Sequence, residues 1–579
     1  MTITPTMTTK KESRRKQLEV LRAALEKEQT RFRVHWRELV DHVRPRRAQW
    51  STSETNQKEL RNLYIVNNTA TLASRTMASG MMGGITSPAR PWFRLGLPDS
   101  ELAEQESVKA WLHLVAQRMT NVFLRSNLYN ALPILYGDLG DVATGAMLIE
   151  EDFGKVVRFY TLPIGTYYLA LNDKLEVDVF HREFSLTVRQ LVERFGEHDE
   201  NGNPKMSKFS QSVQANYQKD QLDEWVDVYH TIQRNKDYNP KSLTSKLYQS
   251  MYYEKGTTGS DVFDQGKFLR DKGYDYFPVL CPRWGTTGED VYGTNSPGMV
   301  ALGDIKALQV LEKRKAQAVD KMVNPPLKGP VVLKNSKVSL LPGDISYIDT
   351  RSGMEGLTPI HEVRFDIAAV SAEIDKHEFR IRRAYFEDLF LMLANTDRRQ
   401  ITATEIVERQ EEKLLALGPV LEQLNQDLLD PLIDITFDIM VKQGYIPPPP
   451  EELQGMQLKV EYISIMHQAQ KLAGLSGIER LAQFIGELSE YKPEVADKLN
   501  ADQMVDDYAD IVGSNPGLIY SDEVVAEMRE ARAEAEAAMA QAEQLKNMGG
   551  AAKDLAGADM EGNNALTQLM AASQAGALQ

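Results

Sequence analysis

The chain has 579 residues, of which 42% are hydrophobic and 26% charged, and these values are typical of a folded protein with several domains. Its formal net charge of −15 argues against a protein that simply coats nucleic acid. The single cysteine, Cys281, excludes an internal disulfide, and neither a signal-peptide pattern nor an apolar run of about 20 residues is present, so we expect a protein of the reducing cytoplasm that does not enter membranes.

The first half of the chain, residues 1–291, predicts one large α+β region. A long amphipathic helix is expected over 9–43, because apolar residues recur there at helical spacing. Further helices are expected from about Ile65 to the Gly/Pro-rich "SGMMGGITSPARPW", over 107–126 and over 128–142. Runs such as "KVVRFYTLPIGTYYLALN" and "WVDVYHTIQRN" then favour strands separated by turns.

A helical hairpin with a small β-rich tip is expected next. Residues 292–326 predict a helix with Ser296 as its N-cap and Pro297 in its first turn, ending before "NPP". Residues 327–361 contain short extended runs with Pro, Gly and Lys, which favour a small β element with exposed edges. Residues 362–393 predict a second long helix with apolar residues on one face.

A polar segment, 394–401, separates this hairpin from the segment 402–458, in which we expect a third helix that ends at Gly444. Thr402 and Glu405 form a capping-box signature at its start. Two proline sites should kink this helix, and a glycine should end it. Its apolar stripe steps by three or four residues through Leu417, Leu421, Leu424, Leu428, Leu432, Ile435 and Ile439.

The last fifth of the chain carries most of the negative charge. Residues 451–579 hold 22 Asp/Glu against 9 Lys/Arg, so 13 of the 15 net negative charges fall there. We expect a compact acidic helical region over 459–520, an Ala/Glu-rich helix over 521–546 and a mobile tail after it. The acidity either serves solubility or keeps this surface from binding DNA.

Motifs for catalysis are scarce. The stretch "GTTGSDVFDQGK" has the wrong spacing for a phosphate-binding loop and lacks a hydroxyl residue after its lysine. The nine histidines are scattered, and we interpret His377 as a packing or hydrogen-bonding residue. Asp138 and Asp141 are interpreted as caps of a helix end and turn, with a metal-binding carboxylate pair as the alternative. We therefore expect no catalytic site, metal site or cofactor.

The arrangement of elements suggests an assembly. A helical hairpin with a β tip buries too little surface to be stable alone, so its apolar stripe needs neighbours. Copies of the same chain packed side by side in a ring supply them most economically. The polar segment at 394–401 would then be repeated around the axis of the ring.

Two stretches and the order of the elements resemble the head-to-tail connector, or portal, proteins of short-tailed bacteriophages. The stretch "YGTNSPGMVALGDIKALQVLEKRKAQAVDKMVNPPL" at 292–327 is similar to that family's first stem helix, with its Tyr-Gly start and Asn-Pro end. The stretch "MLANTDRRQITATEIVERQEEKL" at 392–414 is similar to the family's tunnel loop and the start of its long helix. The order of elements agrees over about residues 1–515.

The resemblance implies a mainly helical α+β portal fold, assembled as a dodecameric ring at one vertex of a capsid. The implied parts are a wing (1–291), two stem helices (292–326 and 362–393), a clip (327–361), a tunnel loop (394–401), a long kinked helix returning to the wing (402–458), a crown (459–520), and a helix that could line a barrel with a flexible tail (521–579).

It also implies the partners and the location. Double-stranded DNA would pass through the ring without sequence-specific contacts. The clip would dock the terminase during packaging and a tail adaptor protein afterwards, and capsid, scaffold and internal core proteins would contact the ring. The protein would belong to the virion and reside in the host cytoplasm during assembly.

Candidate contact residues follow from the same resemblance. In the tunnel loop, the arginine pair would form a collar of positive charge that meets DNA phosphates, or would instead bridge to Asp397, Glu405 or a neighbouring subunit. In the stem, we expect at most two lysines per subunit to reach DNA. In the clip, lysines beside extended runs would either dock partners by edge pairing or simply be solvated. The candidates are Asn395, Thr396, Arg398, Arg399 and Gln400 in the loop, Lys306, Lys313 and Lys321 in the stem, and Lys328, Lys334 and Lys337 in the clip.

Two alternatives remain open at the level of sequence. A different virion protein, such as a scaffold, would suit the Ala/Glu-rich end but would leave the hairpin unexplained. A metal-dependent nuclease using Asp138 and Asp141 would make the carboxylate pair catalytic.

Overall fold

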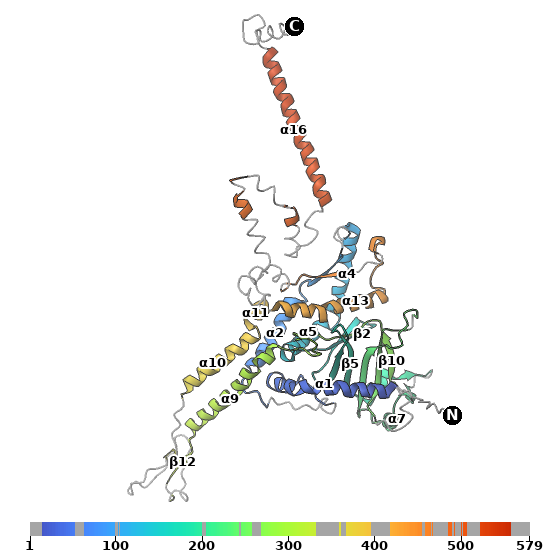
Figure 1. Cartoon of the computed structure of the whole chain (residues 1–579), viewed down its shortest axis with the longest axis vertical. Coiled ribbons are helices and arrows are strands. Elements are labelled where there is room, and N and C mark those ends of the chain that lie inside the picture. Colours follow the sequence, from blue (N-terminus) through green and yellow to red (C-terminus); the bar gives the residue numbers. More distant parts are fainter. Residues whose placement is uncertain are drawn as a thin grey trace, which may run out of the picture. The chain divides into compact units, whose positions relative to one another are not determined.

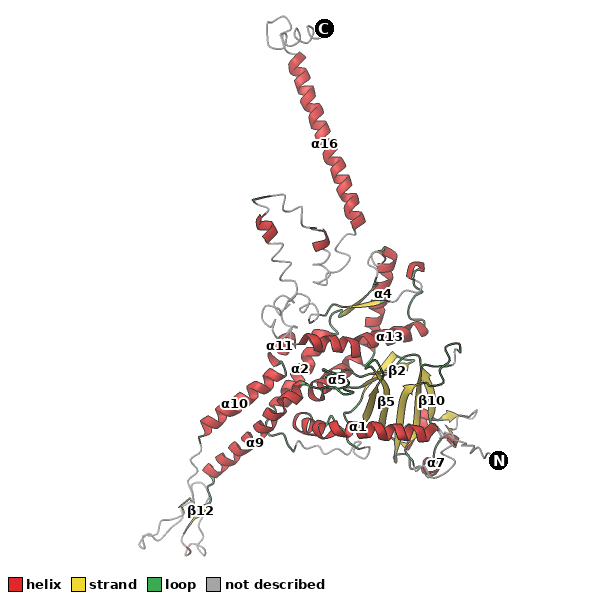
Figure 2. Cartoon of the chain, in the orientation of Figure 1, coloured by secondary structure: helices red, strands yellow, loops and turns green. Residues whose placement is uncertain are grey.

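The computed structural model describes residues 14–51, 63–98, 105–199, 204–242, 245–256, 268–329, 366–394, 417–453, 458–464 and 522–556, together with short pieces near 102, 331, 358–359, 466, 484–492 and 500–505. The chain divides into two compact units, Met1–Ala496 and Asp497–Gln579, and each is described by itself. The first unit mixes helices and strands (Figure 2), as the sequence predicts. Among the described helices, none combines the length and apolar character needed to cross a lipid bilayer.

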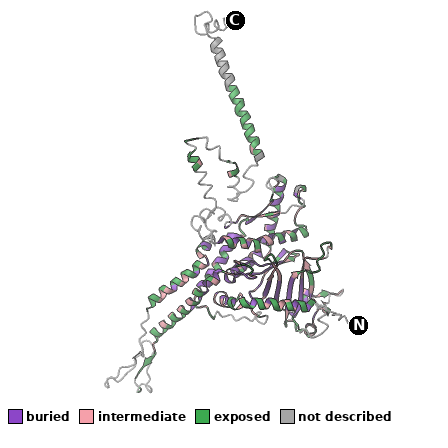
Figure 3. Ribbon diagram, in the orientation of Figure 1, coloured by how far each residue is buried: buried purple, intermediate pink, exposed green. Residues whose placement is uncertain are grey.

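Four helices of the first unit lie where the sequence predicts them. They are α1 (Arg14–Val43), α2 (Thr69–Ile85), α4 (Glu106–Arg125) and α5 (Leu128–Val142). The apolar side of α1 is buried at Leu18, Leu25, Trp36 and Leu39. Helix α5 is buried along most of its length (Figure 3), so it forms the centre of the core rather than one of its walls.

Two antiparallel sheets complete this domain. The smaller one has the order β11 (Val279–Leu280), β2 (Met147–Asp152), β3 (Val156–Thr161). The larger one has the order β10 (Arg270–Tyr274), β9 (Tyr248–Glu254), β8 (Trp225–Arg234), β5 (Val177–Thr187), β4 (Tyr167–Leu171). Short elements beside them are α6 (Val188–Phe195), β6 (Glu197–His198), β7 (Pro204–Lys205), the 3₁₀ turn η2 (Met206–Lys208) and α7 (Gln211–Gln218).

Helices cover both faces of the larger sheet. On one face, Leu18 of α1 packs with Tyr229, Met251 and Tyr253 of β8 and β9. On the other face, α6 and α7 pack against residues that alternate with these along the strands, and the cluster includes Leu191, Phe195, Val213, Val228 and Tyr252. Because neighbouring residues of a strand point to opposite faces, the buried polar side chains of this sheet, such as His181 and His230, lie beneath one helical layer or the other.

His181 of β5 is one such sealed group, and it makes stability depend on pH. Burial and the nearby Arg22 guanidinium lower the pKa of His181 to about 3. The unfolded chain, with an imidazole pKa near 6.5, therefore binds more protons than the folded chain between pH 6.5 and pH 3, so stability falls as pH falls through that window. We expect a loss of about 2 kcal/mol between pH 7.5 and pH 5 from this group. Urea unfolding at the two pH values measures it.

Two histidine variants serve this measurement, one at the buried position in β5 and one on the exposed side of α1. His181→Leu should reduce the pH dependence by about the same amount. His35→Leu, on the exposed side of α1, should leave it unchanged. Equal pH dependence in wild type and His181→Leu would contradict the assignment.

The helical hairpin forms as predicted, with one correction. Helix α9 (Pro297–Val323) begins at Ser296, whose Oγ accepts a hydrogen bond from the Met299 N–H at 3.3 Å, and ends at Asn324. Helix α10 (Ile367–Ala384) runs beside it (Figure 1). At the tip, β12 (Leu327–Lys328) pairs with β13 (Thr358–Pro359).

The single helix expected over 362–393 is wrong, because the structure breaks it. After α10, Phe386 adopts a φ of +53°, and a separate helix, α11 (Glu387–Ala394), follows. A left-handed residue cannot continue a right-handed helix, and the fully buried Tyr385 fixes the turn in place. Helix α11 then packs on α2, where Gly80 leaves room for the Phe390 ring: a Cβ at Gly80 would lie 2.3 Å from the Phe390 Cβ.

The third helix is confirmed in its described part, and its start at 402 lies outside the described residues. Residues 417–424 are helical, a π-helical turn covers Asn425–Leu429, and α13 spans Asp430–Lys442 with Pro431 in its first turn. The break therefore falls at the predicted Asp-Pro site, and Gly444, with φ +73°, follows the helix end. All seven members of the predicted apolar stripe are buried.

The boundary expected at 459 is also corrected. After a 3₁₀ turn, η6 (Glu451–Leu453), residues expected to open a helical crown form a strand, β14 (Lys459–Tyr462), which pairs antiparallel with β1 (Phe93–Gly96) of the first domain. The Arg94–Glu461 ion pair, at 2.6 Å, supports that pairing. Valine and tyrosine alternate with charged residues here, a pattern that satisfies a strand better than a helix.

The second unit contains the predicted Ala/Glu-rich helix. Helix α16 spans Asp522–Ala556 and so continues ten residues beyond Lys546, where the sequence predicts a mobile tail. Arg529 of this helix donates to both carboxylate oxygens of Asp502 at 2.7 Å. Residues 524–542 are almost entirely exposed, so this helix has little packing of its own within its unit.

Candidate functional site

Helix α5 forms hydrogen bonds with both helices of the hairpin, at the end of the hairpin that joins the domain. At its carboxyl end, the Asp141 carbonyl accepts a hydrogen bond from Ser296 Oγ at 3.0 Å, and the Asp141 carboxylate accepts one from the Tyr385 hydroxyl at 3.2 Å. Ser296 begins α9 and Tyr385 ends α10. Asp141, a buried residue of α5, is therefore hydrogen-bonded to the start of α9 and to the end of α10.

Two arginines neutralise the acids at this junction. Arg44 donates to Asp138 at 3.0 Å and to Asp141 at 2.5 Å, while Arg47 donates to Asp138 at 2.8 Å and 3.0 Å and to the Leu162 carbonyl at 2.6 Å. Both carboxylates are almost fully buried. Burial raises the pKa of Asp141, and the Arg44 guanidinium acts against that rise. The cluster is a buried, charge-paired anchor between α1, α5 and the hairpin.

This geometry corrects the interpretation of Asp138 and Asp141. Both lie inside α5 and neither caps a helix end. Their oxygens face guanidinium groups, which compete with any cation for the same lone pairs. Among the residues that the structure describes, no group of three or more histidine, cysteine or acidic side chains is placed to hold a metal ion. The nuclease alternative therefore loses the carboxylate pair on which it depended.

Sequence reasoning missed the arginines. The signal that could have indicated them is the "RPRR" run at 44–47, directly after the end of α1. A basic run is normally exposed to solvent. The spacing of residues in the sequence therefore does not predict that Arg44 and Arg47 pair with buried aspartates 91 to 97 positions away.

His377 joins the two hairpin helices. Its Nδ1 lies 2.7 Å from the Asp304 carboxylate of α9, and its Nε2 lies 4.0 Å from Glu373. Asn67 adds a second link, because its side-chain amide donates to Glu378 of α10 at 2.8 Å while Gln309 of α9 accepts from its backbone N–H at 2.8 Å. The predicted hydrogen-bonding role of His377 is confirmed.

The outward half of α9 is basic. Ile305 and Leu308 are fully buried, whereas Lys306, Lys313 and Lys321 are exposed on the opposite half of the helix. The Lys306 ammonium lies 3.3 Å from Glu38 of α1, so part of its charge is used within the subunit.

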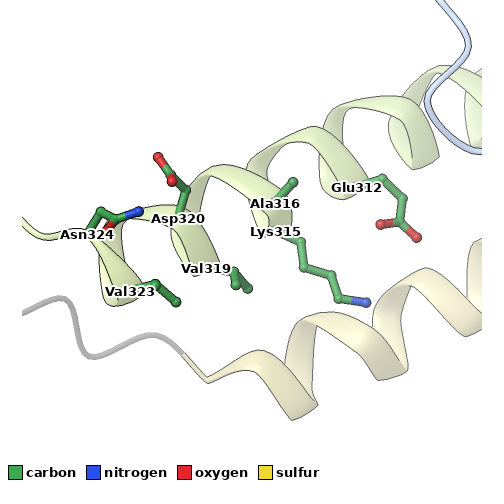
Figure 4. A pocket seen from close by; sticks show the side chains of 7 residues that line it. All are labelled: Glu312, Lys315, Ala316, Val319, Asp320, Val323 and Asn324. Atoms are coloured by element: carbon green, nitrogen blue, oxygen red, sulfur yellow. The ribbon is translucent and has the colours of Figure 1, made fainter. Parts of the chain in front are cut away.

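Another lysine of α9, Lys315, lines a pocket near the tip of the hairpin and does not belong to this basic half of the helix. The pocket is lined by Glu312, Lys315, Ala316, Val319, Asp320, Val323 and Asn324. In Figure 4 the Lys315 and Glu312 side chains point toward α10 rather than away from the hairpin. Lys315 is therefore a poor candidate for contact with a ligand on the outward face.

The remaining predicted residues divide by location. Lys328 is exposed in β12. The other clip lysines and the five tunnel-loop residues lie outside the described residues: Lys334, Lys337, Asn395, Thr396, Arg398, Arg399 and Gln400. The structure brings the stem lysines onto one helix face, and the roles assigned to all these residues stay predictions.

Substitutions at two glycines of α9 test the anchor that Asp141 forms with the hairpin. A Cβ at Gly298 would lie 2.6 Å from the Asp141 carbonyl oxygen and 3.0 Å from the Tyr385 hydroxyl, so Gly298→Ala should force α9 away from α5. We expect the free energy of unfolding to fall by about 1–3 kcal/mol, measured by chemical denaturation. The matched variant is Gly303→Ala, one and a half turns along the same helix, where a Cβ meets nothing within 4 Å. It should be neutral or stabilising by up to about 1 kcal/mol, and similar losses in both variants would contradict the anchor.

The described site is thus an α+β domain hydrogen-bonded through Asp141 to both helices of a hairpin, with exposed lysines along α9. The chain belongs to the bacteriophage head to tail connecting protein family, whose model matches residues 15–519.

Two relatives named as portal proteins are similar to this chain over most of its length, and one solved structure aligns with it. The chain is 45% identical over 546 residues to the portal protein of Salmonella phage epsilon15, covering 94% of each chain. It is 41% identical over 547 residues to the probable portal protein of Bordetella phage BPP-1, covering 94% of this chain and 96% of that one. A chain in the solved "Virion of native gene transfer agent (GTA) particle" aligns with a TM-score of 0.31 and 11% identity over 81% of this chain and 96% of that chain.

Proposed function

We propose that twelve copies of this chain form a portal ring at one vertex of a phage capsid, and that double-stranded DNA passes through its channel during packaging and ejection. The observation that carries the proposal is the similarity, over 94% of the chain, to relatives named as portal proteins, together with membership of the head-to-tail connecting family. In this assembly the protein is a virion component that resides in the host cytoplasm while particles are built.

The parts of the ring are assigned from the chain order. The domain before Ser296 is the wing, α9 and α10 are the stem, and β12 with β13 belongs to the clip. Residues 394–401 form the tunnel loop at the constriction. The clip docks the terminase first and the tail adaptor later, and capsid, scaffold and internal core proteins contact the outer surfaces. Helix α16 lines a barrel in this arrangement.

The hairpin's charge pattern supports contact with DNA. The exposed lysines of α9 lie in a chain whose net charge is −15, so they are a local exception. Repeated around a ring, such charges meet phosphates on any side of a duplex without reading bases. Lys313 and Lys321 are the better candidates, because Lys306 already pairs with Glu38.

The mass and projected shape of the purified protein test the ring. Twelve chains of 65.3 kDa give about 780 kDa, and light scattering with negative-stain imaging should show that mass with a central hole. A dimer or an open filament that never closes under any ionic condition would contradict the proposal and favour a scaffold protein.

A further inference from the structure

A charged row crosses the larger sheet on the face covered by α6. Arg182 of β5 pairs with His230 of β8, His230 pairs with Tyr252 of β9, and Tyr252 pairs with Arg270 of β10. Direct cross-strand partners point to the same face, so these four side chains form one continuous line. The His230 and Tyr252 rings stack at 3.7 Å between centroids with 9° between their planes, which keeps the row rigid.

A third arginine joins the row from the helix above it. The Arg194 guanidinium of α6 lies 5.7 Å from the centroids of both the Phe195 and Tyr252 rings. The Arg270 guanidinium lies 5.7 Å and 4.9 Å from the same two rings. The Arg182 side chain hydrogen-bonds Tyr252 as well, so three guanidinium groups from a helix and two strands lie around this tyrosine.

One carboxylate accompanies these three positive charges. Glu150 of β2 accepts from Arg194 at 3.0 Å and from the Tyr252 hydroxyl at 3.1 Å. Within the described part of the chain, no ion pair joins Arg182 or Arg270 to a carboxylate. His230 adds no compensation, because burial and the three arginines hold its pKa well below the usual value and the ring stays neutral.

The cluster also contains buried polar atoms that lack partners in the described structure. Arg182 is 7% exposed, and its guanidinium lies 4.3 Å from the Phe184 ring centroid. Its Nε, and the Nδ1 of His230, make no hydrogen bond there. A buried charge without its own counter-ion is costly in a low-dielectric site, and the excess of three arginines over one carboxylate adds mutual repulsion. At its outer edge the cluster reaches solvent, since the Arg194 side chain is 28% exposed.

We propose that Arg182, Arg194 and Arg270 form a binding site for a small oxyanion of the phosphate class. Guanidinium forks match the oxygens of a phosphate, and a doubly charged anion balances the excess charge that Glu150 leaves. The site suits a small free anion rather than a nucleic-acid backbone, because Arg182 is 7% exposed and the Arg194 side chain only 28% exposed. A bound anion joins α6, β5 and β10, so it stabilises this part of the domain.

Inorganic phosphate tests the site on the full-length protein. Thermal unfolding is followed as phosphate replaces chloride at constant ionic strength and pH, and isothermal titration gives the affinity. We expect saturable stabilisation in the wild type and an affinity about tenfold weaker or worse in Arg270→Gln. Arg270→Lys keeps the charge without the fork, so its affinity should lie between the two.

The matched control is Arg189→Gln, which removes an arginine from the exposed side of the same helix α6. Arg189 pairs with Asp223 only at 3.8 Å, so its variant should bind phosphate like the wild type. A single cooperative melting transition of each variant in chloride establishes that it folds. No difference between phosphate and chloride in the wild type, or the same phosphate effect in Arg270→Gln, would overturn the site.

Discussion

Asp138→Ala should lower the free energy of unfolding of the main domain by about 3 kcal/mol. The carboxylate is fully buried and accepts hydrogen bonds from both Arg44 and Arg47, so its removal leaves two largely buried guanidinium groups with too few acceptors. The loss of an acceptor near a buried cation costs more than the pair itself contributes, because the cation has already lost its water. Chemical denaturation followed by tryptophan fluorescence measures the change.

Two comparisons separate the buried pair from a general effect of removing an acid. Asp223→Ala removes a carboxylate that is 90% exposed and lies 3.8 Å from Arg189, so it should cost less than about 1 kcal/mol. In an Arg47→Ala background, Asp138→Ala should cost less than in the wild type, since one of the stranded cations is then absent. If Asp138→Ala behaves like Asp223→Ala, the cluster does not anchor the hairpin.

The local signals in the sequence located the hairpin well. The Ser296-Pro297 start of α9 and the seven-member apolar stripe that ends in Ile439 are encoded within a few residues of chain, and both are confirmed. Helix caps and periodic burial depend on near neighbours in sequence, so a pattern of 20 or 30 residues contains enough information to predict them.

Features of the fold that depend on contacts between distant parts of the chain could not be predicted from local sequence patterns. The break after α10 depends on Tyr385 reaching Asp141, a residue 244 positions earlier, and nothing in the local sequence marks Phe386 as left-handed. The strand at Lys459–Tyr462 forms because β1, more than 360 positions earlier, offers a free edge. The same limit applies to the arginine row on the larger sheet, whose members come from β5, α6 and β10 and meet only through strand pairing.

The double variant Arg398→Glu/Arg399→Glu should strongly reduce DNA packaging while leaving the ring intact. In the proposed ring each pair is repeated twelve times at the tunnel loop, so the variant replaces a collar of positive charge with a negative one facing phosphates. We expect packaged DNA per particle to fall by about tenfold or more, measured by nuclease protection after assembly. Arg398→Lys/Arg399→Lys keeps the charge and should retain most of the packaging, since contact with a moving duplex needs charge more than fork geometry.

The mass of the variant ring separates DNA contact from subunit bridging. If the arginines act by pairing with Asp397, Glu405 or a neighbouring subunit, charge reversal places like charges together and the assembly of about 780 kDa should fail to form. An intact ring that does not package therefore supports phosphate contact, and loss of the ring supports bridging. An intact ring that packages normally would remove both roles from the loop and would move the search for DNA contacts to Lys313 and Lys321, which face outward on α9 whether or not the loop takes part.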